Sequence, residues 1–205
     1  MAKVHPQLAS SSSPPPPPSP YASRRETFTI WMKSLVLHGN GCTAFDAKGD
    51  VVYRIDNYNK KGGNQVYLMD LRGEVLFVIH RKKPGVLGCW EGYRSNGSEE
   101  SMEKPCFKVR KVCRILNAKA TYRVTVGCDR AQPDYYKIEG GLRTDKSAYK
   151  IVDELGGVVA EVKRKQSSSG VVLGGDVFTL MVEPHVDHSL IMGIVVVYGL
   201  INHKL

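Results

Sequence analysis

The sequence predicts a mainly β protein, in which a closed antiparallel β-barrel encloses a hydrophobic C-terminal α-helix. Three observations lead to this fold class. A turn motif followed by an alternating strand occurs three times, further short strands alternate in the same way, and the chain ends in an uncharged apolar segment. The 20 glycines and 11 prolines among 205 residues also fit a chain with many turns.

Residues 1–25 differ in composition from the rest of the chain. The stretch SSSSPPPPPSP, from Ser10 to Pro20, has low complexity and almost no apolar surface to bury, so we expect a disordered tail. A transit peptide is the alternative, because the segment contains Lys3, Arg24 and Arg25 but no acidic residue. We expect the remaining residues, 26–205, to form one domain.

The repeated motif consists of Asp, two residues, Gly, one residue, and then Val at the start of an alternating run. It occurs in FDAKGDVVYRI (45–55), MDLRGEVLFVI (69–79) and VDELGGVVAEV (152–162). Asp favours the first position of a type I turn and Gly the fourth, so each motif predicts a hairpin. The positions expected on one buried face are Val51, Tyr53, Ile55, Val75, Phe77, Ile79, Val158, Ala160 and Val162.

Four other stretches have the two-residue period of a half-buried or fully buried strand: ETFTIWM, CFKVRK, TYRVTV and DVFTLMV. Their inward positions are expected to be Phe28, Ile30, Phe107, Val109, Tyr122, Val124 and Val126. Lys108, Arg110 and Arg123 then point outward. No long amphipathic helix is recognisable between Phe28 and Pro184, so the strands predict an antiparallel barrel or sandwich.

Leu190 to Ile201 is a run without any charged residue. As a helix it would be roughly 18 Å long, whereas the hydrocarbon core of a bilayer is about 30 Å thick. The segment is too short to span a membrane, so we expect a helix over about residues 189–202 inside a wide barrel, with Asp187 or Ser189 as its N-cap. A buried strand is the alternative, because Val195 to Val197 are β-branched, but the length favours a helix.

Several long stretches resemble plant LURP-one-related proteins, in order from Phe28 to Leu205. They include IWMKSLVLHGNGCTAFDAKGDVVYRIDNY, CWEGYRSNG, YKIEGGLRTDKSAYKIVDELGGVVAEVKRK and DVFTLMVEPHVDHSLIMGIVVVYGLI. The resemblance implies a fold similar to the C-terminal domain of Tubby proteins and of phospholipid scramblases, with twelve antiparallel strands around a hydrophobic C-terminal helix. It also implies a link to plant defence and brings no enzymatic activity. Tubby-like relatives bind phosphoinositides through basic surface residues, but no Tubby position can be matched to a residue here.

The sequence contains neither a P-loop nor a Gly-x-Ser-x-Gly motif, so we expect no enzyme and no cofactor. His185, Asp187 and His188 lie close together, but zinc needs a further ligand, so helix capping by Asp187 is the simpler interpretation. The cysteines are odd in number and include no Cys-x-x-Cys pair, which favours reduced thiols and a cytoplasmic location, with the nucleus or a membrane periphery as alternatives. They are Cys42, Cys89, Cys106, Cys113 and Cys128.

The formal net charge of +9 favours nucleic acid, anionic lipid or acidic protein as a partner. Basic residues form three clusters, namely Arg81, Lys82 and Lys83, then Lys108, Arg110, Lys111 and Arg114, and finally Lys163, Arg164 and Lys165. Such clusters suit an anionic phospholipid headgroup such as a phosphoinositide. The alternative is that they keep a β protein soluble and protect its strand edges. No helix-turn-helix, zinc or RNA-binding signature supports nucleic acid.

The predicted function is therefore a non-enzymatic module that recognises anionic phospholipid headgroups in plant defence-related signalling. The alternative is a scaffold for an unknown protein partner, or a transcription-linked regulator, that has no lipid ligand.

Overall fold

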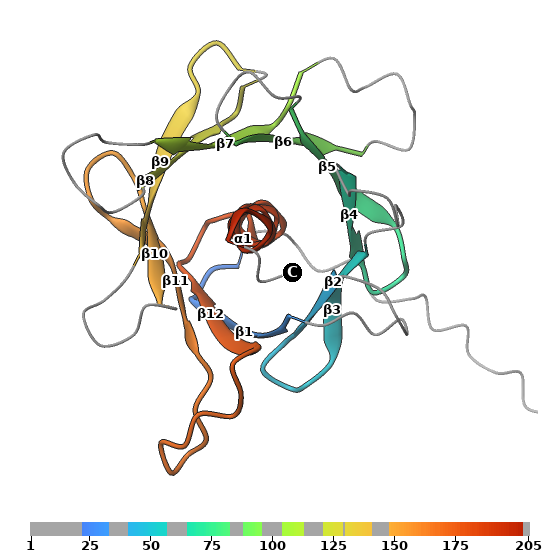
Figure 1. The fold of residues 1–205 in the computed structure, drawn as a ribbon, viewed down its shortest axis with the longest axis vertical. Helices are drawn as coiled ribbons and strands as arrows, with labels where there is room; N and C mark the ends of the chain where they lie inside the picture. Colours follow the sequence, from blue (N-terminus) through green and yellow to red (C-terminus); the bar gives the residue numbers. More distant parts are fainter. Residues whose placement is uncertain are drawn as a thin grey trace, which may run out of the picture.

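The computed structural model describes residues 22–32, 41–56, 65–82, 88–95, 104–112, 121–128, 130–140 and 148–202. Within these residues twelve antiparallel strands close into a barrel around a single helix (Figure 1), which confirms the predicted fold class. The elements are β1 (Glu26–Trp31), β2 (Gly41–Phe45), β3 (Val51–Asp56), β4 (Gln65–Asp70), β5 (Val75–Arg81), β6 (Cys89–Arg94), β7 (Phe107–Val112), β8 (Thr121–Val126), β9 (Asp134–Gly140), β10 (Tyr149–Val152), β11 (Val158–Arg164), β12 (Val177–Val182) and α1 (His188–Ile201).

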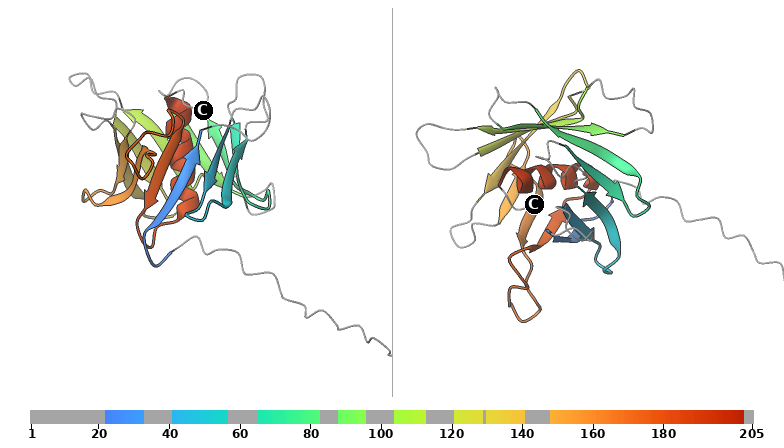
Figure 2. Two further views of the ribbon diagram at one scale, coloured as in Figure 1. Left: turned by 90° about the horizontal axis from the view of Figure 1, so that it is seen from below. Right: turned by 45° about the vertical axis from the view of Figure 1, so that its right-hand side comes forward.

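Each strand pairs with its neighbours in the sequence, and β12 closes the barrel by pairing with β1. Because neighbouring strands are antiparallel, the even-numbered strands finish at one end of the barrel and the odd-numbered strands at the other. We call the first the turn end: it carries the β2–β3, β4–β5 and β10–β11 turns and the start of α1. We call the second the cation end: β5, β7 and β11, which carry the basic clusters, and α1 finish there. Figure 2 shows α1 running through the barrel between these two ends.

The three predicted turns have the same hydrogen bonds. In the first, the backbone N–H of Gly49 donates to the carbonyl of Asp46 at 3.2 Å, and Oδ1 of Asp46 accepts from the backbone N–H groups of Lys48 and Asp50. The turns that begin at Asp70 and Asp153 repeat every one of these bonds. The glycine at the fourth position has φ between 83° and 91° in all three, which only glycine adopts without strain. The turn motif is confirmed.

A fourth turn of the same design joins β11 to β12. The backbone N–H of Gly170 donates to the carbonyl of Ser167 at 2.9 Å, and the Ser167 hydroxyl oxygen accepts from the backbone N–H of Val171 at 3.1 Å. Gly170 again has a left-handed φ, of 81°. The Asp-x-x-Gly pattern did not predict this turn, because serine stands in the place of aspartate.

The predicted alternation is confirmed along most strands, and all the inward positions named for β1, β7 and β8 are buried. Within the repeats, Ile55, Phe77, Ile79, Ala160 and Val162 are buried, while Val51, Tyr53 and Val75 are half-buried. The prediction for Val158 is wrong, because this side chain is 39% exposed. The pairing register shifts between Ile151 and Val152, opposite Val158, and equivalent shifts occur opposite Val51 and Val75, so the bulge beside each turn keeps the first residue of the next strand out of the fully buried core.

The apolar segment at the C-terminal end of the sequence forms α1, and its residues from Leu190 to Val197 are all buried inside the barrel. Asp187, one of the two residues predicted as the N-cap, is the cap: its Oδ1 accepts from the backbone N–H groups of Ser189 and Leu190. Arg94 of β6 donates to the other oxygen of Asp187 at 2.6 Å and so ties the start of the helix to the barrel wall. No helix in the described part of the chain is long enough to cross a membrane.

Candidate anion-binding site on the outer wall

The three basic clusters finish at the same end of the barrel. Arg81 is the last residue of β5, Lys111 is the penultimate residue of β7 and Arg164 is the last residue of β11, all at the cation end. Lys83 and Arg114 lie outside the described residues.

Around the circumference, however, the clusters are not together. Only β6 separates β5 from β7, so the first two clusters are neighbours on the wall. In the ring of twelve strands, β11 lies diametrically opposite β5, and so the third cluster faces another direction (Figure 1). One ligand of headgroup size cannot contact all three.

Part of the neighbouring pair of clusters is neutralised by Glu91, which is buried between them. Its carboxylate lies 3.3 Å from the ammonium groups of both Lys82 and Lys108, and Tyr93 donates to it at 3.0 Å. Burial would raise the pKa of Glu91, but the hydrogen bonds from Tyr93 and Lys108 outweigh burial and lower the pKa below its usual value. Lys82 and Lys108 are thus partly committed to a structural ion network.

The third cluster is also partly engaged. Lys163 and Lys150 pair with Glu161 at 2.8 Å and 3.6 Å, and Lys165 donates to the hydroxyl of Thr29. Burial acts to raise the pKa of Glu161, but these two lysines outweigh it and lower the pKa. This arrangement is typical of surface ion pairs that support a strand.

The register of β7, β8 and β9 creates a cationic row that no sequence cluster indicated. Arg110 is directly opposite Arg123, and Arg123 is directly opposite Lys137. All three side chains are exposed, and we refer to them as the cation ladder. Like charges directly opposite each other destabilise an antiparallel pair. Among the described residues, neither Arg110 nor Arg123 has an acidic side chain within ion-pair distance, whereas Lys137 pairs with Glu139.

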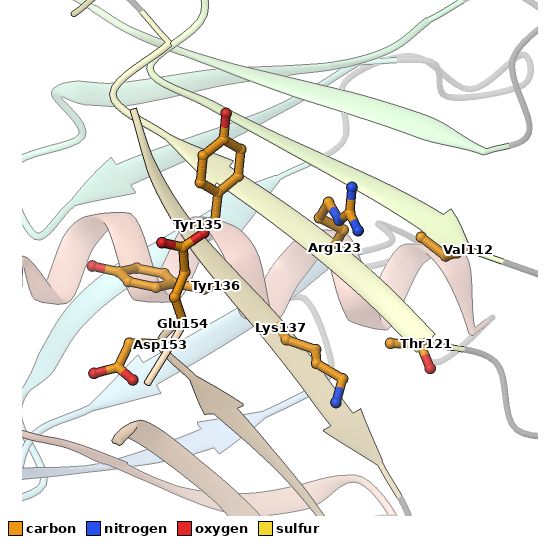
Figure 3. Close-up of a pocket in the computed structure, with 8 residues that line it drawn as sticks. All are labelled: Val112, Thr121, Arg123, Tyr135, Tyr136, Lys137, Asp153 and Glu154. Atoms are coloured by element: carbon orange, nitrogen blue, oxygen red, sulfur yellow. The ribbon is translucent and has the colours of Figure 1, made fainter. Parts of the chain in front are cut away.

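A pocket of about 490 Å³ opens on the outer wall beside the cation ladder. Its lining residues are Val112, Thr121, Arg123, Tyr135, Tyr136, Lys137, Asp153 and Glu154. Figure 3 shows β9 running through the middle, with Arg123 and Thr121 on one side and Asp153 and Glu154 on the other. The pocket therefore has a cationic side and an acidic side.

The two sides of the pocket suit different ligand groups. Guanidinium and ammonium groups bind phosphate oxygens through charge-assisted hydrogen bonds. Asp153 uses Oδ1 to hold the β10–β11 turn, and Glu154 is an exposed residue of the same turn, so the acidic side accepts hydrogen bonds from hydroxyl or ammonium donors. A ligand that combines a phosphate with such donors matches the pocket as a whole.

Sequence reasoning identified Arg110 as a candidate and placed Arg123 on the outer face, but it named neither Arg123 nor Lys137 as a site residue. The alternation of TYRVTV was the available signal for Arg123. What could not be seen was which residues of the adjacent strands stand opposite it, because the pairing register depends on the whole barrel.

The structure shows contacts for Asp187 and His188, two of the three possible metal ligands, and it describes four of the cysteines. Asp187 caps α1, and Nδ1 of the buried His188 lies 3.3 Å from a carboxylate oxygen of Glu26. In the described part of the chain no three metal-ligating side chains come together. Four of the cysteines are described, and all four are free thiols. Burial raises the pKa of the Cys42 thiol to about 12, so this residue behaves as a small apolar core group.

Comparison with known proteins gives consistent matches. Residues 26–199 match the family model described as LURP-one-related. Protein LURP-one-related 11 of Arabidopsis thaliana is 47% identical over 209 residues, which cover 98% of this chain and 89% of the relative. Protein LURP-one-related 3 of the same plant is 44% identical, over 100% of this chain and 94% of the relative. An X-ray structure of an Arabidopsis thaliana protein superposes with a TM-score of 0.61 at 18% identity, over 90% of this chain and 96% of that one, which supports the fold alone.

Proposed function

The chain belongs to the LURP-one-related family, and from this premise we propose that it is a non-enzymatic binding module for the phosphorylated headgroup of an anionic phospholipid. The observation that carries the proposal is the cation ladder, three in-register cations of which two have no acidic partner among the described residues. The plant-defence role implied by the family resemblance stays a prediction.

The cation ladder lowers the stability of the free protein and gains interaction energy at an anionic surface. Opposed like charges on adjacent strands repel one another. A Lys or Arg near an anionic leaflet contributes about 1 kcal/mol, so the three together are worth about 3 kcal/mol, or roughly a hundredfold in affinity. Arg110 and Arg123 stand opposite each other with no acidic partner among the described residues, and such a pair is more readily explained as a binding site than as a support for the sheet.

The pocket beside the ladder favours a phosphoinositide over a lipid that carries only a phosphate. Arg123 and Lys137 are placed for a phosphate, while Asp153 and Glu154 across the pocket can accept hydrogen bonds from ring hydroxyls. An inositol phosphate ring has both kinds of group. This division of roles predicts that the ladder sets the affinity and that the acidic side sets the choice among anionic headgroups.

The test is flotation with vesicles of phosphatidylcholine that contain either a phosphoinositide or phosphatidylserine at equal total charge, at physiological ionic strength. The ladder variant is Arg110→Ala/Arg123→Ala/Lys137→Ala. The control, Lys48→Ala/Arg72→Ala/Lys104→Ala, removes the same charge from exposed positions elsewhere.

We expect the wild type and the control to float with the phosphoinositide vesicles, and the ladder variant to lose about a hundredfold in affinity. Equal loss in the two variants would mean that net charge alone drives binding. Absence of wild-type binding to either vesicle would contradict the proposal and favour a protein-interaction scaffold.

A further inference from the structure

The β11–β12 connection is a hairpin that extends beyond the barrel wall. Its arms are joined by hydrogen bonds from the backbone N–H of Leu173 to the carbonyl of Lys165, at 3.0 Å, and by a bridge between Gln166 and Val172. The Ser167 turn closes the tip. Both Figure 1 and Figure 2 show this orange-red hairpin projecting away from the barrel, with no other described element covering it.

The returning arm of the hairpin carries three consecutive exposed apolar side chains. Val171, Val172 and Leu173 are 63%, 43% and 54% exposed. Because successive residues of a strand point to opposite faces, both faces of this ribbon carry exposed apolar surface. An uncovered two-stranded ribbon is marginally stable in water, and a contiguous exposed apolar patch usually marks a contact surface.

A partly exposed tryptophan lies at the base of the hairpin. Trp31 is the last residue of β1, stands opposite Val177 and is 36% exposed. Its indole N–H donates to Oδ2 of Asp176 at 3.0 Å, so the ring is held at the edge with its polar atom satisfied. An indole with an apolar body and a bonded N–H is the side chain most characteristic of the boundary between water and lipid.

The charge of the hairpin indicates what covers the patch. Residues 161–176 include Lys163, Arg164 and Lys165 and the acids Glu161 and Asp176, of which Glu161 pairs with Lys163 and Asp176 accepts from Trp31, so the net charge of the segment stays positive. The hairpin therefore combines a cationic base with an apolar arm and an uncharged, serine-rich tip. A protein groove would cover one face of such a ribbon, whereas the interior of a bilayer surrounds both faces.

We propose that the tip of the β11–β12 hairpin inserts into an anionic bilayer, with Val171, Val172 and Leu173 in its apolar boundary layer and Trp31 at its surface. This inference rests on the proposed lipid-binding function and adds a contact of the hairpin with the apolar layer of the bilayer to the contact of the ladder with the headgroup. Only β10 separates β9, which carries Lys137, from β11, so the ladder and the hairpin lie in neighbouring sectors of the wall. Along the strands they lie at different heights, because Lys137 stands opposite Val152 and Val152 opposite Val158, the first residue of β11, whereas the hairpin follows Arg164, the last.

Two exposed leucines provide a matched control. Leu71 and Leu155 are 59% and 98% exposed, and both are in turns at the opposite end of the barrel. Substituting them removes exposed apolar surface without touching the hairpin.

The experiment compares the full chain, the hairpin variant Val171→Ser/Val172→Ser/Leu173→Ser and the control Leu71→Ser/Leu155→Ser on phosphatidylcholine vesicles that contain a phosphoinositide. Thermal unfolding verifies that each variant folds. The second readout is tryptophan quenching by brominated phosphatidylcholine, which is sensitive to Trp31, because the other tryptophan, Trp90, is only 5% exposed. The variant Trp31→Phe identifies the quenched residue.

We expect the hairpin variant to bind at least about tenfold more weakly, which corresponds to about 1.4 kcal/mol, and the control to bind as the wild type does. Quenching should occur in the wild type and disappear in both Trp31→Phe and the hairpin variant. Wild-type binding by the hairpin variant, or vesicle binding without quenching, overturns the insertion while leaving headgroup binding by the ladder intact. Loss of self-association in the hairpin variant would instead assign the patch to a second copy of the chain and overturn the proposal. Absence of any vesicle binding overturns both proposals.

Discussion

Replacing Asp187 with alanine tests how the terminal helix is held inside the barrel. The substitution removes an N-cap that accepts from the backbone N–H groups of Ser189 and Leu190, and a cap of this kind contributes about 1 kcal/mol. It also removes the acceptor for the buried Ser189 hydroxyl, which costs about 1–2 kcal/mol when it is left unpaired. The ion pair with Arg94 adds less, about 0.5 kcal/mol, because that guanidinium is 42% exposed. The expected loss is about 3 kcal/mol.

Urea unfolding followed by circular dichroism measures this loss, and Asp187→Asn is the informative comparison. Asparagine still accepts the backbone N–H groups at the cap but gives up the charge that pairs with Arg94. The asparagine variant should therefore lose only about 1 kcal/mol. Equal losses in the two variants, or a loss below about 1 kcal/mol for alanine, would refute the reasoning that the cap anchors the helix.

Three further substitutions test the packing inside the barrel, the equivalence of the four turns and the ion network around Glu91. Gly92→Ala should cost at least about 3 kcal/mol in thermal or urea unfolding, because a Cβ there would lie 2.1 Å from the ring of the fully buried Phe107; a near-neutral result would mean that this ring is not packed as described. Ser167→Asp should raise the free energy of unfolding by a few tenths to about 1 kcal/mol, because the three sister turns use an aspartate at this position, and a loss of stability would contradict the equivalence of the four turns. Glu91→Gln tests the lowered pKa of that carboxyl. A carboxyl with a lowered pKa stabilises the fold above its unfolded pKa, and this stabilisation is lost as the pH falls. The difference in the free energy of unfolding between the wild type and the variant should therefore be largest above about pH 5 and shrink in acid. A difference that does not change with pH would contradict the ion network.

The features that could be predicted from the sequence are those encoded locally. The Asp-x-x-Gly turns depend on a side chain that bonds to its own backbone two and four residues later, and so the four-residue pattern is sufficient to predict them. The position of α1 follows from the length of an uncharged segment that can only be buried, and its cap at Asp187 follows from the residue type.

The features that could not be predicted depend on pairing across the barrel. Arg110, Arg123 and Lys137 are separated in the sequence, and only the register of β7 to β9 places them in one row. The separation of the third basic cluster from the first two likewise follows from the position of β11 in the closed ring. The segment from Val171 to Leu173 has the composition of a buried strand, and its exposure became evident only from the projecting hairpin.

The central claim is that the cation ladder on β7 to β9 binds a phosphorylated headgroup. The most direct measurement is a titration of the full-length, isotope-labelled chain with a soluble inositol phosphate, followed by backbone NMR shifts. We expect saturable shifts centred on Arg110, Arg123 and Lys137, with smaller shifts at Asp153 and Glu154 across the pocket. Shifts centred on Lys163 to Lys165, or no saturable shift at all, would contradict the central claim.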